Sequence, residues 1–123
     1  MNEQATEILQ GDVYWVAPEA LVPEIPGHAH PQVVIQLDVL NRSRITTVVV
    51  CALTSNLQRR AEPGNVTLDV GEADLPRPSV VVVSQISTVD KSRLGAYVGR
   101  LGRDRVAQIL AGIELQQRSF FAR

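Results

Sequence analysis

The sequence predicts a small domain that is mainly β, with a strongly curved sheet or barrel and one helix at the C-terminal end. Roughly five or six short stretches are rich in Val, Ile and aromatic residues and are separated by Pro, Gly, Asn and Ser, which is typical of strands and turns. The last stretch instead spaces its apolar residues three and four positions apart, which is typical of a one-sided helix. A chain of 123 residues has room for one hydrophobic core, so we expect one domain over residues 1–123.

The composition is that of a folded globular protein. Hydrophobic residues make up 45% of the sequence and charged residues 20%, which argues against disorder. The net charge of −1 gives no overall basic footprint for nucleic acid, although the arginines at 42, 44, 59 and 60 can form a local basic rim. The single cysteine, Cys51, lies in an apolar run and is expected to be buried. With no secretion leader or membrane-spanning run evident, we expect a cytoplasmic protein without membrane contact.

The first strand is expected over residues 11–16, where β-branched and aromatic residues precede Pro18. Tyr14 and Trp15 are adjacent on it and must face opposite ways. We expect one ring in the core and the other free to stack on a base or to meet a second subunit. The proline-rich loop over 17–31 is long for a small domain, and such loops are often functional.

The later strands follow from short apolar runs bounded by turn residues. Two near-continuous runs are expected to be strands joined by a turn at residues 41–44, and a polar loop follows over 55–65. The expected strands after the first are at residues 32–40, 45–53, 66–70, 80–86 and within 93–102.

The helix is expected from Asp104 onwards. Val106, Ile109, Leu110 and Ile113 follow the spacing of one helix face, which should pack against the sheet. Asp104 near the start complements the helix dipole, as does a basic residue near the end.

In this order, the blocks GDVYWV, HPQVVIQLD, TTVVVCALTSN and SVVVVSQISTVDKSRL resemble the MazF/PemK family of bacterial toxins from type II toxin–antitoxin pairs. The resemblance runs from about Ile8 to about Leu115. It implies an SH3-like small barrel with a terminal helix, the CcdB/PemK/MazF-like plasmid maintenance toxin fold. It also implies a homodimer, an antitoxin whose extended tail occupies the RNA groove, and a sequence-selective, metal-independent endoribonuclease. Such an enzyme cleaves single-stranded RNA by 2′-hydroxyl attack, leaves a 2′,3′-cyclic phosphate and needs no cofactor.

The resemblance implies two catalytic positions, of which one departs from the family. Thr54, in the sequence ALTS, matches the threonine whose hydroxyl donates to a phosphoryl oxygen. The family pattern Gly-x-x-Arg-Pro-x-Val-Val is GHAHPQVV here, so His30 stands where the family has arginine. Arginine stabilises phosphate charge, whereas histidine is the commonest general acid or base. We therefore expect His30 to be the general acid, alone or with His28, and the pH–rate profile to be bell-shaped with a limb near neutrality.

Further site residues are expected around this pair. Glu24 lies one position out of register with the loop acid of many family members, and either orients His30, acts as base or is a solvated carboxylate. Gln85 matches the family's strand glutamine, with a core-edge amide paired to backbone as the alternative. Asp90 is expected to be structural, accepting backbone amides at a turn. The expected RNA contacts are Ser55, Asn56, Arg59, Arg60 and Gln85.

The same residues also allow three other interpretations of the function. His28 and His30 lie two apart on an extended segment and are able to meet one metal ion, but no second His or Cys pair completes a site, so no metal is expected. Loss of the arginine can instead leave a weak or inactive relative that binds antitoxin or nucleic acid without cleavage. The related gyrase-poisoning toxins share the barrel, but the block QISTVDKSRL fits the ribonuclease branch better.

Overall fold

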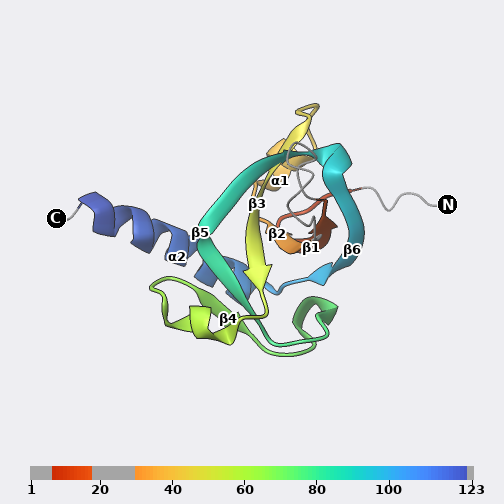
Figure 1. Ribbon diagram of the computed structural model, residues 1–123. Helices are drawn as coiled ribbons and strands as arrows, with labels where there is room; N and C mark the ends of the chain where they lie inside the picture. The colour runs from red at the N-terminus through yellow and green to blue at the C-terminus, as the bar shows by residue number, and fades with distance from the viewer. Residues whose placement is uncertain (1–6, 18–29, 122–123) are drawn as a thin grey trace, which may run out of the picture.

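The computed structural model describes residues 7–17 and 30–121, with side chains to residue 118. All neighbouring strands are antiparallel, and the six-stranded sheet has the order β4-β5-β3-β2-β1-β6. Figure 1 shows the sheet strongly curved, with α2 running past it toward the C-terminus. The elements are β1 (Asp12–Val16), β2 (His30–Val34), α1 (Asp38–Asn41), β3 (Thr47–Thr54), η2 (Leu57–Ala61), β4 (Val66–Leu68), η3 (Glu72–Asp74), β5 (Ser79–Asp90), η4 (Lys91–Arg93), β6 (Leu94–Arg100) and α2 (Arg103–Phe121), where η marks a 3-10 turn.

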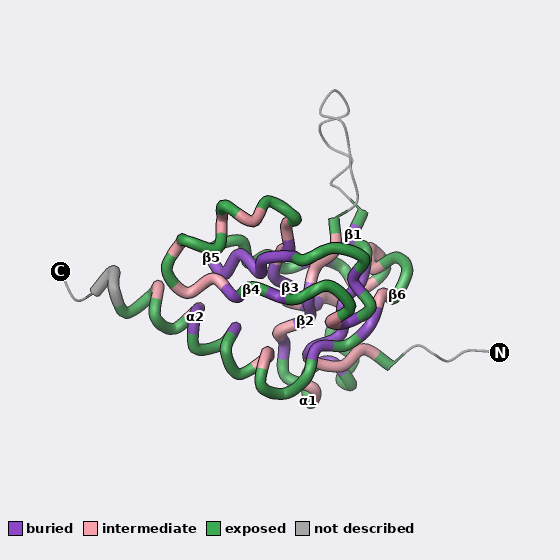
Figure 2. The backbone as a smooth tube through the Cα atoms, turned by 90° about the horizontal axis from the view of Figure 1, so that it is seen from below, coloured by how far each residue is buried: buried purple, intermediate pink, exposed green. Residues whose placement is uncertain are grey.

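The central strands bury side chains on both faces of the sheet, which explains their unbroken apolar runs. Figure 2 shows the buried backbone concentrated in these strands. One face carries the helix-side cluster, which consists of Val13, Val33, Cys51, Leu53, Val66, Leu68, Ala73, Leu75, Val81, Val83, Leu101 and Ile109. The other face carries the second cluster, which consists of Tyr14, Val16, Val34, Val48, Val50 and Val89.

The predicted mainly β fold with a C-terminal helix is confirmed, as is the helix start near Asp104. Val106, Ile109 and Ile113 of α2 pack on the helix-side cluster, but Leu110 is 41% exposed, so the predicted apolar face is wrong at that position. The helix also meets the polar loop after β3. A Cβ at Gly112 would lie 2.0 Å from the carbonyl oxygen of Gly64, so the two backbones touch.

The prediction of one strand over 32–40 is wrong. β2 ends at Val34, and α1 follows, because two buried amides turn the chain. Gln36 Nε2 donates to Asn41 Oδ1 at 2.9 Å, and Asn41 Nδ2 donates to the Gln36 carbonyl at 2.9 Å. The apolar residues that suggested a longer strand are in fact exposed, at 61% for Leu37 and 71% for Val39.

The strand predicted at 80–86 is longer, because β5 runs from Ser79 to Asp90. Its pairing with β3 is irregular: Leu53 pairs with Val81, whereas Cys51 pairs with Ile86. Extra residues of β5 therefore bulge between two regular segments, which bends the strand around the barrel. At the far end, Asp90 accepts the backbone N–H of Ser92 at 2.9 Å, which confirms its predicted structural role.

Two expectations about side chains on the strands are also confirmed. Tyr14 is 8% exposed and Trp15 39%, so the two rings face opposite ways. Cys51 is buried; its thiol donates to the Val82 carbonyl at 3.2 Å, and burial raises its pKa to about 12. In the part of the chain that the structure describes, no helix is both long and apolar enough to cross a membrane.

Candidate functional site

The two residues expected to carry the chemistry lie at the ends of neighbouring strands. In the β2–β3 ladder Gln32 pairs with Ala52, so the register continued by two residues sets His30 opposite Thr54. His30 also pairs with Val16 of β1, and Thr54 pairs with Val80 of β5. Both side chains line the same two hollows, one on each side of this strand end.

The first hollow, which we call the amide hollow, lies on the face of the second cluster. His30 and Gln32 alternate with Val34 along β2, and Thr54 and Ala52 alternate with Val50 along β3, so all project to that face. The hollow has a volume of about 370 Å³. Its amide and hydroxyl groups are neutral donors and acceptors suited to base edges. Its lining residues are His30, Gln32, Ala52, Leu53, Thr54, Arg59, Gln85, Ile86 and Ser87.

The second hollow, which we call the tryptophan hollow, lies toward the helix-side face. Trp15 pairs with Pro31, which is adjacent to His30 and therefore projects to the opposite face. The hollow has a volume of about 470 Å³ and is more apolar in its lining. Its lining residues are Trp15, His30, Pro31, Leu53, Thr54, Ser55, Leu75, Pro76, Arg77 and Ser79.

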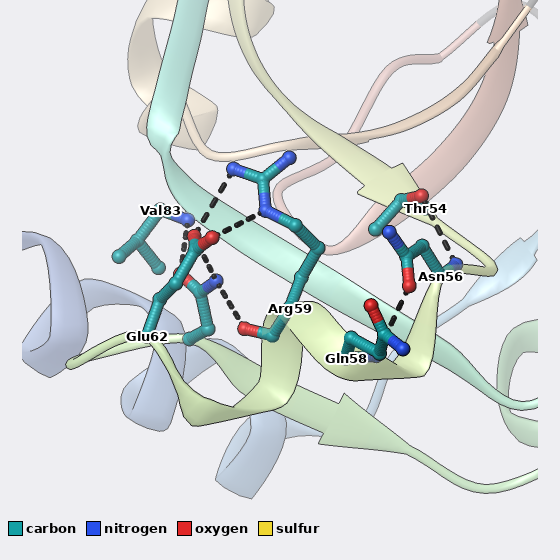
Figure 3. A network of polar contacts seen from close by, with 7 residues as sticks. Thr54, Asn56, Gln58, Arg59, Glu62 and Val83 are labelled. Atoms are coloured by element: carbon teal, nitrogen blue, oxygen red, sulfur yellow. Dashed lines mark hydrogen bonds and ion pairs between the residues drawn. The ribbon is translucent and has the colours of Figure 1, made fainter.

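The Thr54 hydroxyl is oriented by the turn that follows it. The backbone N–H of Asn56 donates to Thr54 Oγ1 at 3.1 Å (Figure 3). Since this contact uses a lone pair, the hydroxyl proton remains available to donate to a phosphoryl oxygen. Asn56 Oδ1 in turn accepts the Gln58 N–H at 3.1 Å and begins η2, so the predicted RNA contact Asn56 has a structural use for its oxygen.

Arg59 lines the amide hollow, but its charge is paired. Its Nε donates to Glu62 at 2.5 Å and its Nη2 at 3.0 Å, as the dashed lines in Figure 3 show. These hydrogen bonds lower the pKa of Glu62 and raise that of Arg59. Asn65 completes the brace: Nδ2 donates to the Arg59 carbonyl at 2.9 Å, and Oδ1 accepts the Val83 N–H at 3.0 Å.

Of the remaining predicted RNA contacts, some line the two hollows and one lies on the surface outside them. Gln85 is exposed and lines the amide hollow. Ser55 is exposed and lines the tryptophan hollow. Arg60 lines neither hollow, and its Nη1 donates to the Leu57 carbonyl at 3.2 Å. Glu24 and His28 lie outside the described residues.

Several residues that line the two hollows were not among the predicted site residues, and they include Trp15, Gln32, Arg77 and Ser87. Gln32 follows from the period of two that starts at His30. Arg77 carries no such signal, because only the path of the chain from η3 to β5 brings it beside Thr54. Among residues 7–17 and 30–121, no three His, Cys, Asp or Glu side chains are grouped to hold a metal ion.

Comparison with known proteins identifies the family. The family described as PemK-like, MazF-like toxin of type II toxin–antitoxin system matches residues 9–116. The protein named Endoribonuclease MazF6 of Mycobacterium tuberculosis is 35% identical over 106 residues, which cover 86% of this chain and 93% of that one. Endoribonuclease EndoA of Bacillus subtilis is 30% identical over 108 residues, covering 88% and 92%.

Solved structures agree in fold. The crystal structure of MazE–MazF from Deinococcus radiodurans superposes with a TM-score of 0.74 at 18% identity and covers 90% of this chain and 96% of that one. A mycobacterial endoribonuclease in complex with its cognate antitoxin gives a TM-score of 0.69 at 24% identity, covering 87% and 91%. The predicted CcdB/PemK/MazF-like fold is thus confirmed. With the family matched from residue 9 to residue 116, the chain belongs to the PemK-like, MazF-like toxins of type II toxin–antitoxin systems.

Proposed function

We propose that this chain is the toxin of a type II toxin–antitoxin pair and acts as an endoribonuclease on single-stranded RNA, as one domain over residues 1–123. The observation that carries the proposal is that His30 and Thr54, at the ends of neighbouring strands, line the same two hollows. Relatives that cover most of the chain are named endoribonucleases, which supports the reaction. The scissile phosphodiester lies over the His30–Thr54 pair, and the flanking nucleotides extend into the two hollows.

The chemistry uses only side chains of the protein. A 2′-hydroxyl oxygen forms a bond to the adjacent phosphorus and loses its proton to a base, while the bond to the 5′-oxygen breaks. His30, as imidazolium, gives its proton to that leaving oxygen, and a 2′,3′-cyclic phosphate remains. The Thr54 hydroxyl donates to a non-bridging oxygen as negative charge develops. The base is His28 or Glu24, which the sequence puts in the loop before His30.

RNA recognition is assigned to Gln85 of the amide hollow and to the polar residues that follow Thr54. Gln85 reads base edges, and Ser55 and Asn56 extend the Thr54 corner. Arg59 contributes less to phosphate binding than the sequence predicted, since Glu62 offsets its charge. Arg60 is a candidate for an outer phosphate contact, because it is exposed next to this corner.

The protein acts as a homodimer in the cytoplasm and is held inactive by a cognate antitoxin. Structural relatives are described as complexes with a MazE or cognate antitoxin, which supports this partner class. A second copy is supported by apolar side chains that are exposed in and beside α1. These are Leu37, Val39, Leu40 and Ile45. Light scattering of wild type and Val39→Asp tests the dimer, which the charge should dissociate.

The first experiment is cleavage of a mixed-sequence single-stranded RNA in excess EDTA by wild type, His30→Ala and Thr54→Ala. We expect cyclic phosphate ends from wild type, and a loss of about 100-fold or more in each variant. A pH–rate profile of the wild type should show a limb near neutrality that disappears in His30→Ala.

Each outcome decides a part of the proposal. Cleavage that survives His30→Ala keeps the enzyme and removes the histidine mechanism, as does a flat profile from about pH 5 to 9. If wild type does not cleave at all, the chain is a binding module of the same family. Induction in cells separates these cases again, since a nuclease arrests growth and degrades messenger RNA whereas a silent binder does neither.

A further inference from the structure

The tryptophan hollow is lined by an arginine, Arg77, that has no role in the proposed reaction. Arg77 lies in the loop between η3 and β5, is exposed, and lines this hollow together with His30 and Thr54. No pattern in the sequence connects Arg77 with His30 and Thr54, because Arg77 and His30 are far apart along the chain. The path of the loop makes them neighbours around one opening.

Arg77 also differs from most arginines near the sheet and helix in having no carboxylate partner. Five other arginines form ion pairs, namely Arg42, Arg59, Arg100, Arg105 and Arg118. Within the described ranges, no carboxylate lies at ion-pair distance from Arg77. An unpaired guanidinium beside a hollow keeps its full charge and its fork of donors for a phosphate.

The loop that carries Arg77 is held firmly in place. Pro76 and Pro78 flank it and fix the backbone on both sides. Leu75 is 3% exposed and belongs to the helix-side cluster, and the buried Ser79 donates its hydroxyl to the Arg77 carbonyl at 3.1 Å. A backbone anchored at both ends lowers the entropy cost of holding a ligand.

The hollow is also lined by Trp15, which is the single tryptophan of the chain. The pairing of β1 with β6 shifts in register on both sides of Tyr14, and the second shift spans Trp15. The carbonyl oxygen of Trp15 would lie 2.9 Å from a Cβ at Gly95. The close backbone contact keeps this stretch of β1 in place, while the indole remains 39% exposed. An exposed indole beside a cation is a typical platform for an unstacked base.

We propose that the tryptophan hollow is a nucleotide subsite: Arg77 contacts the phosphate next to the scissile one, and Trp15 stacks on the base between them. Arg77 thereby supplies to this site a fixed positive charge that His30 gives only when protonated. The inference rests on the proposed ribonuclease function, but it makes a separate claim about binding. It predicts that occupancy of the hollow changes Trp15 fluorescence, with no other indole contributing.

The test titrates the full-length protein with a mixed-sequence single-stranded RNA carrying 2′-O-methyl groups, which binds but cannot be cleaved. Wild type should show a saturable change in Trp15 fluorescence. Arg77→Ala should bind roughly tenfold more weakly, the effect of one charge-assisted contact, and Arg77→Lys should recover part of the loss. The slope of log affinity against log salt should fall by about 0.7 in Arg77→Ala. Arg103→Ala, at an exposed arginine on α2, is the matched control and should leave both affinity and slope unchanged.

The outcomes separate this inference from the proposed function. If Arg77→Ala binds with wild-type affinity and slope while wild type cleaves unmodified RNA, the subsite is wrong and the ribonuclease stands. If binding and fluorescence depend on Arg77 but wild type cleaves nothing, the subsite stands and the catalytic proposal fails. An equal loss in Arg77→Ala and Arg103→Ala would mean that only net charge matters, which overturns the subsite. A folded state unchanged in circular dichroism is required of each variant.

Discussion

Two loops flank the strand end that carries His30 and Thr54, and they use their charges differently. In the loop at residues 55–65, Arg59 forms an ion pair with Glu62 of the same loop. The loop at residues 71–79 is braced from outside: Glu72 accepts from Arg105 of α2 at 2.8 and 2.9 Å. Arg77, in the same loop, has no carboxylate at ion-pair distance among the described residues. Its guanidinium donors are therefore open to a ligand, whereas those of Arg59 are engaged by Glu62.

The largest expected effect comes from breaking the contact between the 55–65 loop and α2. Gly112→Ala sets a Cβ against the Gly64 carbonyl and should lower the free energy of unfolding by about 3 kcal/mol. The check is the urea midpoint. Gly102→Ala is the control, because no atom lies within 4 Å of its added Cβ, and it should cost under about 1 kcal/mol. An unchanged midpoint in Gly112→Ala would mean that the loop is not held by the helix.

The next effect concerns the amide that joins this loop to β5. Asn65→Ala removes the acceptor of the Val83 N–H, at a residue that is 1% exposed, and should cost about 2 kcal/mol. Chemical denaturation measures it, with Thr67→Ala on the exposed side of β4 as the comparison. Equal losses in the two variants would reduce Asn65 to an ordinary surface residue.

The ion pair between Glu72 and Arg105, which braces the loop at residues 71–79, should make the free energy of unfolding depend on pH. Hydrogen bonds from Arg105 lower the pKa of Glu72, so its contribution is present above the unfolded value of about 4.3 and is lost as pH falls through the folded value. Glu72→Gln should therefore be less stable than wild type by about 1 kcal/mol at pH 7, and this gap should close in acid. Thermal unfolding at several pH values measures it; a constant gap would exclude ionisation as the cause.

The smallest effect tests whether pairing withholds Arg59 from RNA. Glu62→Gln frees the guanidinium and should raise affinity for the methylated RNA roughly threefold, with a salt slope steeper by up to about 0.7. Glu114→Gln, which releases Arg118 on α2, removes the same charge away from the hollows. Similar gains in both variants would assign the effect to net charge.

Much of this architecture could be predicted from the sequence, for identifiable reasons. Strand positions followed from valine runs and turn residues, and the helix from its spacing. The exception was residues 35–41, where buried Gln36 and Asn41 turn the chain while apolar Leu37 and Val39 face solvent. The pattern of apolar residues cannot reveal that polar residues are buried and apolar ones exposed here. The arrangement depends on hydrogen bonds between Gln36 and Asn41 that form only in the folded chain.

The candidate site likewise contains residues that the sequence predicted and residues that it did not. Thr54, His30 and Gln85 were found from motifs within strands, and the strands bring them to one opening. Trp15 was noted as a ring that faces away from the core, but its partner Arg77 was missed. A loop residue gains its neighbours from the path of the whole chain, and nothing in LPRPS predicts which strand end it reaches. The ion pair of Arg59 with Glu62 was also missed, although its partner lies only three residues along the chain.

The buried Cys51 gives this molecule a built-in reporter of opening. Its thiolate is suppressed both by enclosure and by a pKa of about 12, so an alkylating reagent must wait for the core to separate. The rate of modification under native conditions thus reads the population of open molecules without any label. It also leaves the surface without reactive thiols, so a cysteine introduced beside either hollow can be tagged with a dye while the native residue stays intact.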